Sequence, residues 1–327
     1  MGARARIALI GAGAMGANHA RVIAESEGAD LAVIIDTDPE RVRPLAERLG
    51  CAFAEDLDAA AGCDAVVIAT PTAFHAEAAR GLLELGKPLL VEKPVTPDLE
   101  TSRALVACAE RRGMPLMCGF VERFNPVVAT MRSLLDEEPV HIVGLRHSPE
   151  TPRSTLSVVF DLLIHEIDLA LCYMGSARPT RVCGATSTAG HTPVVEVADC
   201  LLQFPGGAIA TLSASRASQR KVRSQLVATS TALYDVDLLR QDLTVYRHRA
   251  HAQGVGAGQA AGYRAETVID IPFVRHTGEP LALQFAHFLD LVSGRTDACT
   301  ERNSILPAHE VAAAIEACAC ANRASAT

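Results

Sequence analysis

Short apolar runs alternate with longer amphipathic segments over the first 120 residues. We expect the apolar runs to be buried strands at 5–10, 31–35, 65–69, 88–92 and 115–119. The amphipathic segments are expected to be helices at 14–25, 39–49, 73–86 and 98–112. Strands that alternate with helices predict a parallel sheet covered on both faces. The sequence therefore predicts an α/β domain over residues 1–120.

The pattern changes after residue 120, where longer strands follow one another. Strands are expected at 181–189, 195–204, 207–216, 222–230, 232–237 and 242–247, and helices at 125–136, 159–174, 280–293 and 304–323. This order predicts an α+β domain over residues 121–327 with an open, mainly antiparallel sheet. The Gly- and Ala-rich stretch 250–262 is expected to be a loop. The last helix is expected to pack back on the first domain.

A glycine-rich turn joins the first strand to the first helix. Its residues are Gly11, Ala12, Gly13, Ala14, Met15 and Gly16. This spacing lets the backbone approach a pyrophosphate that faces the N-terminus of a helix. Asp36 ends the second strand, where a carboxylate accepts hydrogen bonds from ribose hydroxyls and repels a 2′-phosphate. The combination predicts a Rossmann domain that prefers NAD to NADP, although Arg41 and Arg43 lie nearby.

A lysine follows the strand at 88–92, in the sequence Glu92-Lys93-Pro94. The carboxyl end of a parallel strand is where open α/β sheets bind ligands. An ammonium group at this end can donate a hydrogen bond to a carbonyl or alkoxide oxygen. Lys93 is therefore a candidate for the chemical step, with a surface lysine before a turn as the alternative.

Three of the polar residues in the otherwise apolar segment 159–174 follow a helical spacing. Asp161, His165 and Asp168 stand at i, i+4 and i+7, so they share one face of the predicted helix. A polar stripe on a buried helix indicates a cavity, and a histidine beside a carboxylate is suited to accept a proton. The alternative is a core histidine that a nearby aspartate satisfies.

Composition excludes several classes of function. The formal net charge of −8 argues against a nucleic-acid partner, which favours a basic face. No apolar run reaches the ~18 residues that a membrane span needs. The 10 cysteines show neither a CxxC pair nor metal-like Cys/His spacing. We therefore expect buried thiols in a reducing cytoplasm and no metal site.

Four motifs follow one another along the chain: the glycine turn, Pro71-Thr72-Ala73-Phe74-His75, Glu92-Lys93-Pro94 and Asp161-x3-His165-x2-Asp168. In this order they resemble the glucose–fructose oxidoreductase, inositol dehydrogenase and rhizopine catabolism (Gfo/Idh/MocA) family. The resemblance implies a metal-free catalytic trio of Lys93, Asp161 and His165. It also implies a homodimer or homotetramer formed through the C-terminal sheet. The implied cofactor-binding residues are Gly11, Gly13, Ala14, Met15, Gly16, Asp36, Thr70, Pro71, Thr72, His75, Glu92 and Lys93.

A narrower resemblance rests on residues 119–126 (GFVERFNP) and 161–168 (DLLIHEID). These are similar to the branch that oxidises UDP-N-acetylglucosamine and related sugar nucleotides at C3, except that Glu166 replaces an expected aspartate and Ala232-Leu233 replaces a glycine pair. A diphosphate needs cations, and Arg216 is one further candidate for that role. The predicted substrate-binding residues are Lys93, Arg123, Asn125, Arg146, Arg153, Asp161 and His165. A sugar 3-ketoreductase, a free-sugar or inositol dehydrogenase and, in another class, an NAD(H)-sensing regulator remain as alternatives.

Overall fold

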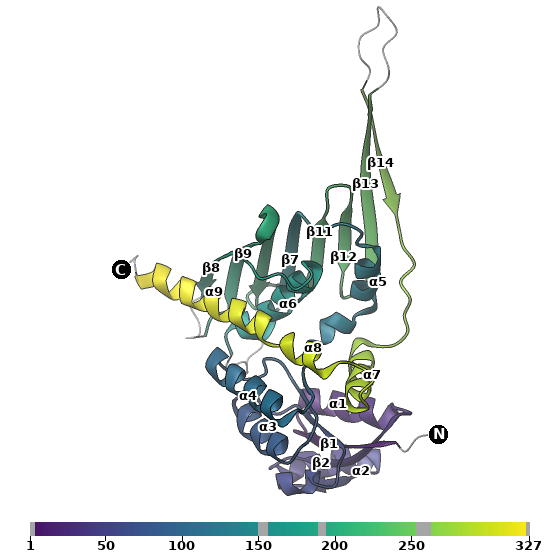
Figure 1. Ribbon diagram of the computed structural model, residues 1–327, viewed down its shortest axis with the longest axis vertical. Coiled ribbons are helices and arrows are strands. Elements are labelled where there is room, and N and C mark those ends of the chain that lie inside the picture. Colours follow the sequence, from purple (N-terminus) through teal and green to yellow (C-terminus); the bar gives the residue numbers. More distant parts are fainter. Residues whose placement is uncertain (1–3, 150–155, 189–193, 253–262, 325–327) are drawn as a thin grey trace, which may run out of the picture. The chain divides into compact units, whose positions relative to one another are not determined.

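The parallel sheet predicted for residues 1–120 is present in the computed structural model (Figure 1). The structure describes residues 4–149, 156–188, 194–252 and 263–324. Within these residues, six parallel strands pair in the order β3-β2-β1-β4-β5-β6. They are β1 (Ala5–Ile10), β2 (Ala29–Ile35), β3 (Ala52–Ala54), β4 (Ala65–Ile68), β5 (Leu89–Val91) and β6 (Leu116–Cys118). Strands β4 and β5 are fully buried, as expected for a sheet covered on both faces.

Helices connect these strands, as the alternating pattern predicts. They are α1 (Ala14–Glu25), α2 (Pro39–Leu49), α3 (His75–Glu84) and α4 (Leu99–Arg112), with the 3-10 turns η1 (Leu57–Ala60), η2 (Thr72–Phe74) and η3 (Val121–Phe124). Asp38 and Asp98 cap α2 and α4 by accepting hydrogen bonds from backbone N–H groups. The sequence did not predict β3, because it is only three residues long; these residues are exposed or half-buried.

Two compact units divide the chain, and the later helices belong partly to the first. One unit comprises Met1–Phe124 and Gly278–Ala314, and the other comprises Asn125–Thr277 and Ile315–Thr327. Helix α7 (Pro280–Val292) explains this division, because Phe285 and Phe288 lie in the same core as Ile23 of α1. The sequence assigned this segment to the second domain, since its pattern shows a helix without showing which core the helix joins. Helices α8 (Ala298–Asn303) and α9 (Leu306–Ala324) follow.

The second unit contains the open, mainly antiparallel sheet that the sequence predicts. Its eight strands within the described segments pair in the order β14-β13-β12-β11-β7-β10-β9-β8. They are β7 (His141–His147), β8 (Arg181–Ser187), β9 (Val197–Gln203), β10 (Ile209–Ser215), β11 (Val222–Ala228), β12 (Leu233–Asp237), β13 (Asp242–Ala252) and β14 (Tyr263–Asp270). The pair β7 and β10 is parallel, and every other pair in the order is antiparallel. The predicted fold class is therefore confirmed.

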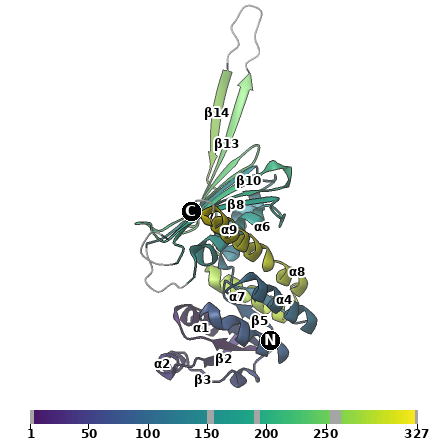
Figure 2. The same ribbon diagram turned by 90° about the vertical axis from the view of Figure 1, so that its left-hand side faces the viewer.

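Strands β7 and β14 were not predicted, and the loop expected at 250–262 is partly wrong. Residues 250–252 continue β13, whereas 253–262 lie outside the described residues. Strand β13 pairs with β12 only over Asp242–Tyr246 and then continues with β14 alone (Figure 2). Beyond Tyr246 the two strands therefore form a two-stranded ribbon.

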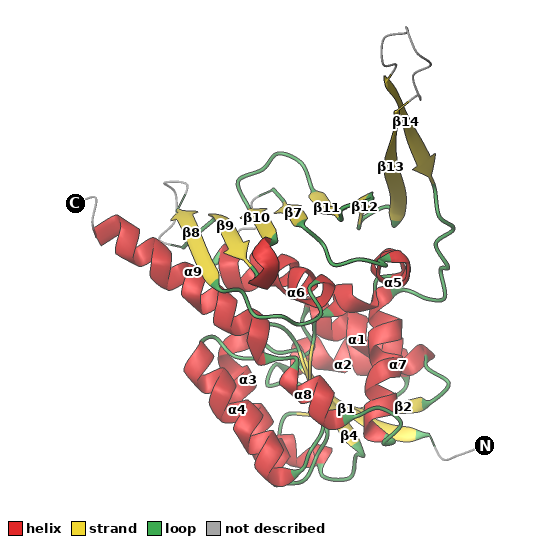
Figure 3. Ribbon diagram, turned by 45° about the horizontal axis from the view of Figure 1, so that its top comes forward, coloured by secondary structure: helices red, strands yellow, loops and turns green. Residues whose placement is uncertain are grey.

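Helices of the second unit lie against this sheet. Helix α5 (Pro126–Leu134) packs on β12 and β13, and α6 (Ile164–Tyr173) packs on β7 and β10 (Figure 3). The helix predicted over 159–174 is not regular, because its first part, η4 (Val159–Leu163), is a π-helical turn. Such turns change the spacing between side chains and occur frequently at functional sites.

Candidate active site

The glycine turn has the geometry that a dinucleotide requires. Gly11 has a φ of +99°, and a Cβ atom there would lie 2.7 Å from the Ala69 oxygen. A Cβ atom on Gly16 would lie 1.9 Å from the Gly11 oxygen, so both positions must lack a side chain for α1 to pack closely on β1. A Cβ atom on Gly13 would meet nothing within 4 Å. Gly13 therefore leaves the N-terminus of α1 open to a ligand.

A cavity of about 570 Å³ lies beside this turn, within the first unit. Among the predicted cofactor-binding residues, those that line it are Gly11, Gly13, Ala14, Asp36, Thr70 and Pro71. Those that do not line it are Met15, Gly16, Thr72, His75, Glu92 and Lys93. Among the described residues, the buried Thr70 Oγ1 has no hydrogen-bond partner. A polar atom of this kind and an open helix N-terminus fit a bound dinucleotide phosphate.

The Asp36 carboxylate is fixed at the edge of the cavity. Its Oδ2 atom accepts a hydrogen bond from Ala12 N at 2.7 Å, and its Oδ1 atom accepts one from Asp38 N at 3.0 Å. Arg41 Nη1 lies 3.9 Å from Asp36 Oδ2. Glu55, Glu77 and Arg41 also line the cavity. Of the described residues, three acidic ones and one basic one therefore line the cavity.

Lys93 lies in a backbone segment that is hydrogen-bonded to buried side chains. Its peptide bond to Pro94 is cis. The Lys93 N–H donates to Glu92 Oε2 at 3.1 Å, and Glu92 Oε1 accepts from His19 Nε2 at 2.8 Å. Burial raises the pKa of Glu92, but its interactions with His19 and Lys93 outweigh this effect, so this pKa lies below its usual value. Glu92 is therefore an ionised carboxylate inside the protein.

His75, a predicted cofactor residue, is also bonded within the protein. Its ring is buried, with Nε2 at 2.8 Å from the Thr70 oxygen and Nδ1 at 3.1 Å from the Pro94 oxygen. The ring thus joins the loops that follow β4 and β5. Contact of His75 or Glu92 with a cofactor stays a prediction.

In the second unit, Arg216 holds Asp161. Asp161 lies in η4, and its Oδ2 atom is 3.3 Å from Arg216 Nη2. The Arg216 side chain is 3% exposed and also donates to the Leu156 oxygen at 2.5 Å. Arg216 was a candidate for binding a substrate anion, but its charge is paired with Asp161. His165 and Asp168 are both buried in α6.

Arg146, another predicted anion-binding residue, belongs to a buried network. Its Nε atom donates to Glu166 Oε1 at 2.7 Å, and Gln225 Nε2 donates to Glu166 Oε2 at 2.7 Å. Tyr173 completes the network by donating to Gln225 Oε1 at 2.5 Å. A Cβ atom on Gly144 would lie 3.1 Å from Glu166 Oε2, so this glycine leaves room for the longer acid. Glu166 is fully buried, and its carboxylate joins α6 to Arg146 of β7 and Gln225 of β11.

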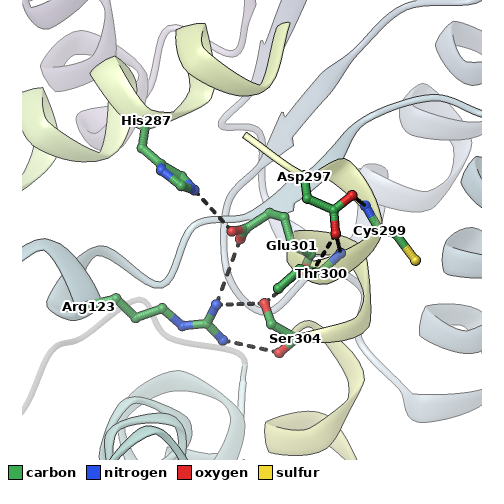
Figure 4. A network of polar contacts seen from close by, with 7 residues as sticks. All are labelled: Arg123, His287, Asp297, Cys299, Thr300, Glu301 and Ser304. Carbon is green, nitrogen blue, oxygen red and sulfur yellow. Dashed lines mark hydrogen bonds and ion pairs between the residues drawn. The ribbon is translucent and has the colours of Figure 1, made fainter. Parts of the chain in front are cut away.

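The remaining predicted substrate residues have contacts of their own. Arg123 Nη1 donates to Ser304 Oγ at 2.7 Å and lies 3.7 Å from Glu301 Oε1 (Figure 4). His287 Nε2 lies 3.1 Å from Glu301 Oε2 in the same network. These contacts join η3 to α7 and α8.

Asn125 caps α5 by accepting a hydrogen bond from Val127 N, and it donates to the Leu238 oxygen at 3.2 Å. Arg153 lies outside the described residues. The described His, Cys, Asp and Glu side chains form no group of three or more around a possible metal position. Among the described residues, no helix is long and apolar enough to cross a bilayer.

A parallel sheet with this glycine turn and an acidic residue at the end of β2 defines a dinucleotide-binding Rossmann domain. Residues 5–120 match the family model described as "Oxidoreductase family, NAD-binding Rossmann fold", and residues 145–234 match the C-terminal domain of the same Gfo/Idh/MocA family. The chain belongs to this oxidoreductase family, so the family predicted from the motifs is confirmed.

Relatives of known name span nearly the whole chain. It is 31% identical over 324 residues to the UDP-N-acetylglucosamine 3-dehydrogenase of Acidithiobacillus ferrooxidans, covering 95% of this chain and 97% of the relative. It is 26% identical over 324 residues to the scyllo-inositol 2-dehydrogenase (NAD(+)) of Bacillus subtilis, covering 90% and 89%. A solved structure of the Acidithiobacillus enzyme superposes with a TM-score of 0.81 at 29% identity, over 97% of this chain and 99% of that chain.

Proposed function

We propose that this chain is an NAD-dependent dehydrogenase that oxidises a sugar hydroxyl to a ketone, with C3 of UDP-N-acetylglucosamine or a related sugar nucleotide as its substrate. The reaction type is inferred from the cavity that Gly13 and Asp36 both line. Gly13 leaves open space there, and a hydrogen bond from Ala12 N fixes the Asp36 carboxylate. The assignment of the substrate rests on the similarity to the Acidithiobacillus enzyme along nearly the whole chain. Membership of an oxidoreductase family weighs against the regulator alternative.

Cofactor choice follows from charge. Gly11, Gly13 and the N-terminus of α1 would hold the pyrophosphate, and Asp36 would accept hydrogen bonds from the adenosine ribose. The carboxylates of Asp36, Glu55 and Glu77 disfavour a 2′-phosphate, so NAD is preferred to NADP. Bound NAD supplies a hydride acceptor for the carbon that bears the hydroxyl.

Three side chains perform the rest of the chemistry in this proposal. An imidazole nitrogen of His165 accepts the hydroxyl proton. Asp161, which Arg216 holds by its Oδ2 atom, stabilises the imidazolium that forms. The Lys93 ammonium donates a hydrogen bond to the oxygen that becomes the carbonyl. In the reverse direction His165 returns the proton, which is how a 3-ketoreductase would work with the same residues.

A second candidate function is oxidation of an uncharged sugar or inositol. The observation that favours it is that Arg123, Arg146 and Arg216 are each paired with a carboxylate of this chain. Guanidinium groups used in this way are poor ligands for a diphosphate. A panel of sugar nucleotides, free sugars and inositols, assayed by NADH fluorescence, separates the two candidates. Faster turnover of scyllo-inositol than of every sugar nucleotide would reject the first.

We also place this enzyme in the cytoplasm, as a homodimer or homotetramer formed through the sheet of its second unit. Leu201, Ile209 and Leu226 are each more than a third exposed. Thr211 is paired with Leu201 and with Val143, and Val143 is paired with Leu226, so the three apolar side chains share one face. Light scattering should show a dimer or tetramer that Leu226→Asp dissociates. A wild-type monomer would contradict the assembly.

A further inference from the structure

Among the described residues, three buried histidines from three helices contact the segment 92–95, which carries Lys93. They are His19 of α1, His75 at the start of α3 and His309 of α9. Their rings are 0%, 1% and 0% exposed. All three helical positions and the segment belong to the first unit. Helices distant in the sequence therefore converge on one short stretch of backbone.

His19 acts on the N-terminal side of Lys93. It donates to Glu92 Oε1 at 2.8 Å, while Glu92 Oε2 accepts from the Lys93 N–H at 3.1 Å. A Cβ atom on Gly119 would lie 2.8 Å from Glu92 Oε2, so a glycine is needed beside this carboxylate. The carboxylate thus transmits the position of α1 to the Lys93 backbone.

His75 and His309 act on the C-terminal side. His75 Nδ1 lies 3.1 Å from the Pro94 oxygen, and the Val95 N–H donates to His309 Nε2 at 3.1 Å. His309 Nδ1 donates to the Ile305 oxygen at 2.8 Å, one turn earlier in the chain. This pair of contacts fixes the neutral tautomer of His309 with its proton on Nδ1. Burial lowers the pKa of His309 to about 4, so the ring remains an acceptor at neutral pH.

We propose that these histidines are positioning residues that hold the backbone on both sides of Lys93 and thereby aim its ammonium at the reacting oxygen, with His309 supplying the contact to Val95. The proposal rests on the proposed function, because it assumes that Lys93 acts on the substrate. Small displacements of a catalytic group are costly in rate, which gives such contacts a kinetic consequence.

Two amide substitutions of His309 each keep one of its two hydrogen bonds and remove the other. Gln places an amide oxygen near the Nε2 position and can accept from the Val95 N–H. Asn places its amide nitrogen near the Nδ1 position and can donate to the Ile305 oxygen, but it does not reach Val95. The Asn variant is therefore the test, and the Gln variant is the matched control.

The expected result is a selective kinetic loss. His309→Asn should lower kcat with UDP-N-acetylglucosamine or scyllo-inositol about 10-fold to 100-fold, while the Kd for NAD changes less than about 2-fold. His309→Gln should keep kcat within about 3-fold of the wild type. Equal kcat values for the two variants, with Lys93→Ala strongly impaired, would overturn the positioning role. If Lys93→Ala keeps full turnover, the proposed function of Lys93 fails instead.

Two readouts need no substrate. The Val95 amide should exchange with deuterium faster in His309→Asn and at the wild-type rate in His309→Gln. The chain has three lysines, Lys87, Lys93 and Lys221. The rate at which a soluble acylating reagent modifies Lys93, relative to Lys221, should change only in the Asn variant. Unchanged amide exchange and Lys93 labelling in His309→Asn would contradict the proposal even if the substrate is not one of those assayed.

A second pair of variants covers the case in which His309→Asn does not fold. In His75→Asn the amide nitrogen can still donate to the Pro94 oxygen, whereas in His75→Gln it reaches the Thr70 oxygen instead. We expect the Asn variant to retain more turnover than the Gln variant when both are saturated with NAD. The opposite order would reject the role of the Pro94 contact.

Discussion

Replacing Arg146 tests whether its charge serves the fold or the substrate. The side chains of Arg146 and Glu166 are 3% and 0% exposed, and they are joined at 2.7 Å. In Arg146→Met, Glu166 keeps the hydrogen bond from Gln225 but loses its only cationic partner within this network. Leaving one member of a buried ion pair uncompensated costs about 3–5 kcal/mol of folding free energy.

The double variant Arg146→Met/Glu166→Met should be more stable than either single variant. Both charges are then absent, and the remaining cost is the unsatisfied amide of Gln225, about 1–3 kcal/mol. Urea unfolding of the wild type, the two single variants and the double variant completes the cycle. A double variant that loses the sum of the two single losses would show that the groups do not act as a pair.

Kinetics of the same variants test whether Arg146 also binds the substrate. If Arg146 serves only the fold, the folded double variant should keep the wild-type KM for UDP-N-acetylglucosamine. A rise in that KM, without a matching rise for a free sugar, would return Arg146 to the substrate site and refute the structural interpretation.

Three further predictions concern the cofactor, the chemical step and acid stability. Asp36→Ser should narrow the preference for NAD over NADP, measured as the ratio of their kcat/KM values, because it removes a repulsive carboxylate. An unchanged ratio would contradict the assignment of Asp36 to the adenosine ribose. Lys93→Ala and His165→Ala should each lower kcat about 100-fold with NAD binding retained, and Asp161→Asn should cost less than His165→Ala. The folded pKa of His309 lies near 4 and its ordinary value is 6.5, so the stability it contributes is complete above pH 6.5 and is lost as the pH falls toward 4. His309→Gln should reduce this acid loss in urea midpoints measured at pH 7 and pH 4.5, and an identical loss would contradict the buried neutral ring.

The sequence predicts most of the first unit because its signals are local. The strands β1, β2, β4, β5 and β6 are apolar runs, and the glycine turn has a fixed spacing. Strand β3 was not predicted because it is only three residues long, and β7 because His141, Gly144, Arg146 and His147 leave it without a long apolar run. In the helix predicted over 159–174, the π-turn depends on packing that no periodicity reveals.

The partners of the charged residues were harder to predict from the sequence than the motifs of the site. Arg123, Arg146 and Arg216 were predicted as anion ligands, yet each meets a carboxylate from another element, between 20 and 178 residues away in the chain. The contact of His309 with Val95 spans 214 positions. Pairings over such separations follow from the tertiary fold, and a single sequence carries no local signal for them.

Turnover of UDP-N-acetylglucosamine with NAD tests the central claim most directly. The proposal predicts that NADH fluorescence rises with this substrate and that the product carries a ketone at C3 of the sugar. It also predicts that His165→Ala abolishes most of this signal. Turnover of free sugars or inositols without any turnover of a sugar nucleotide, or a His165→Ala enzyme with normal rates, would contradict it.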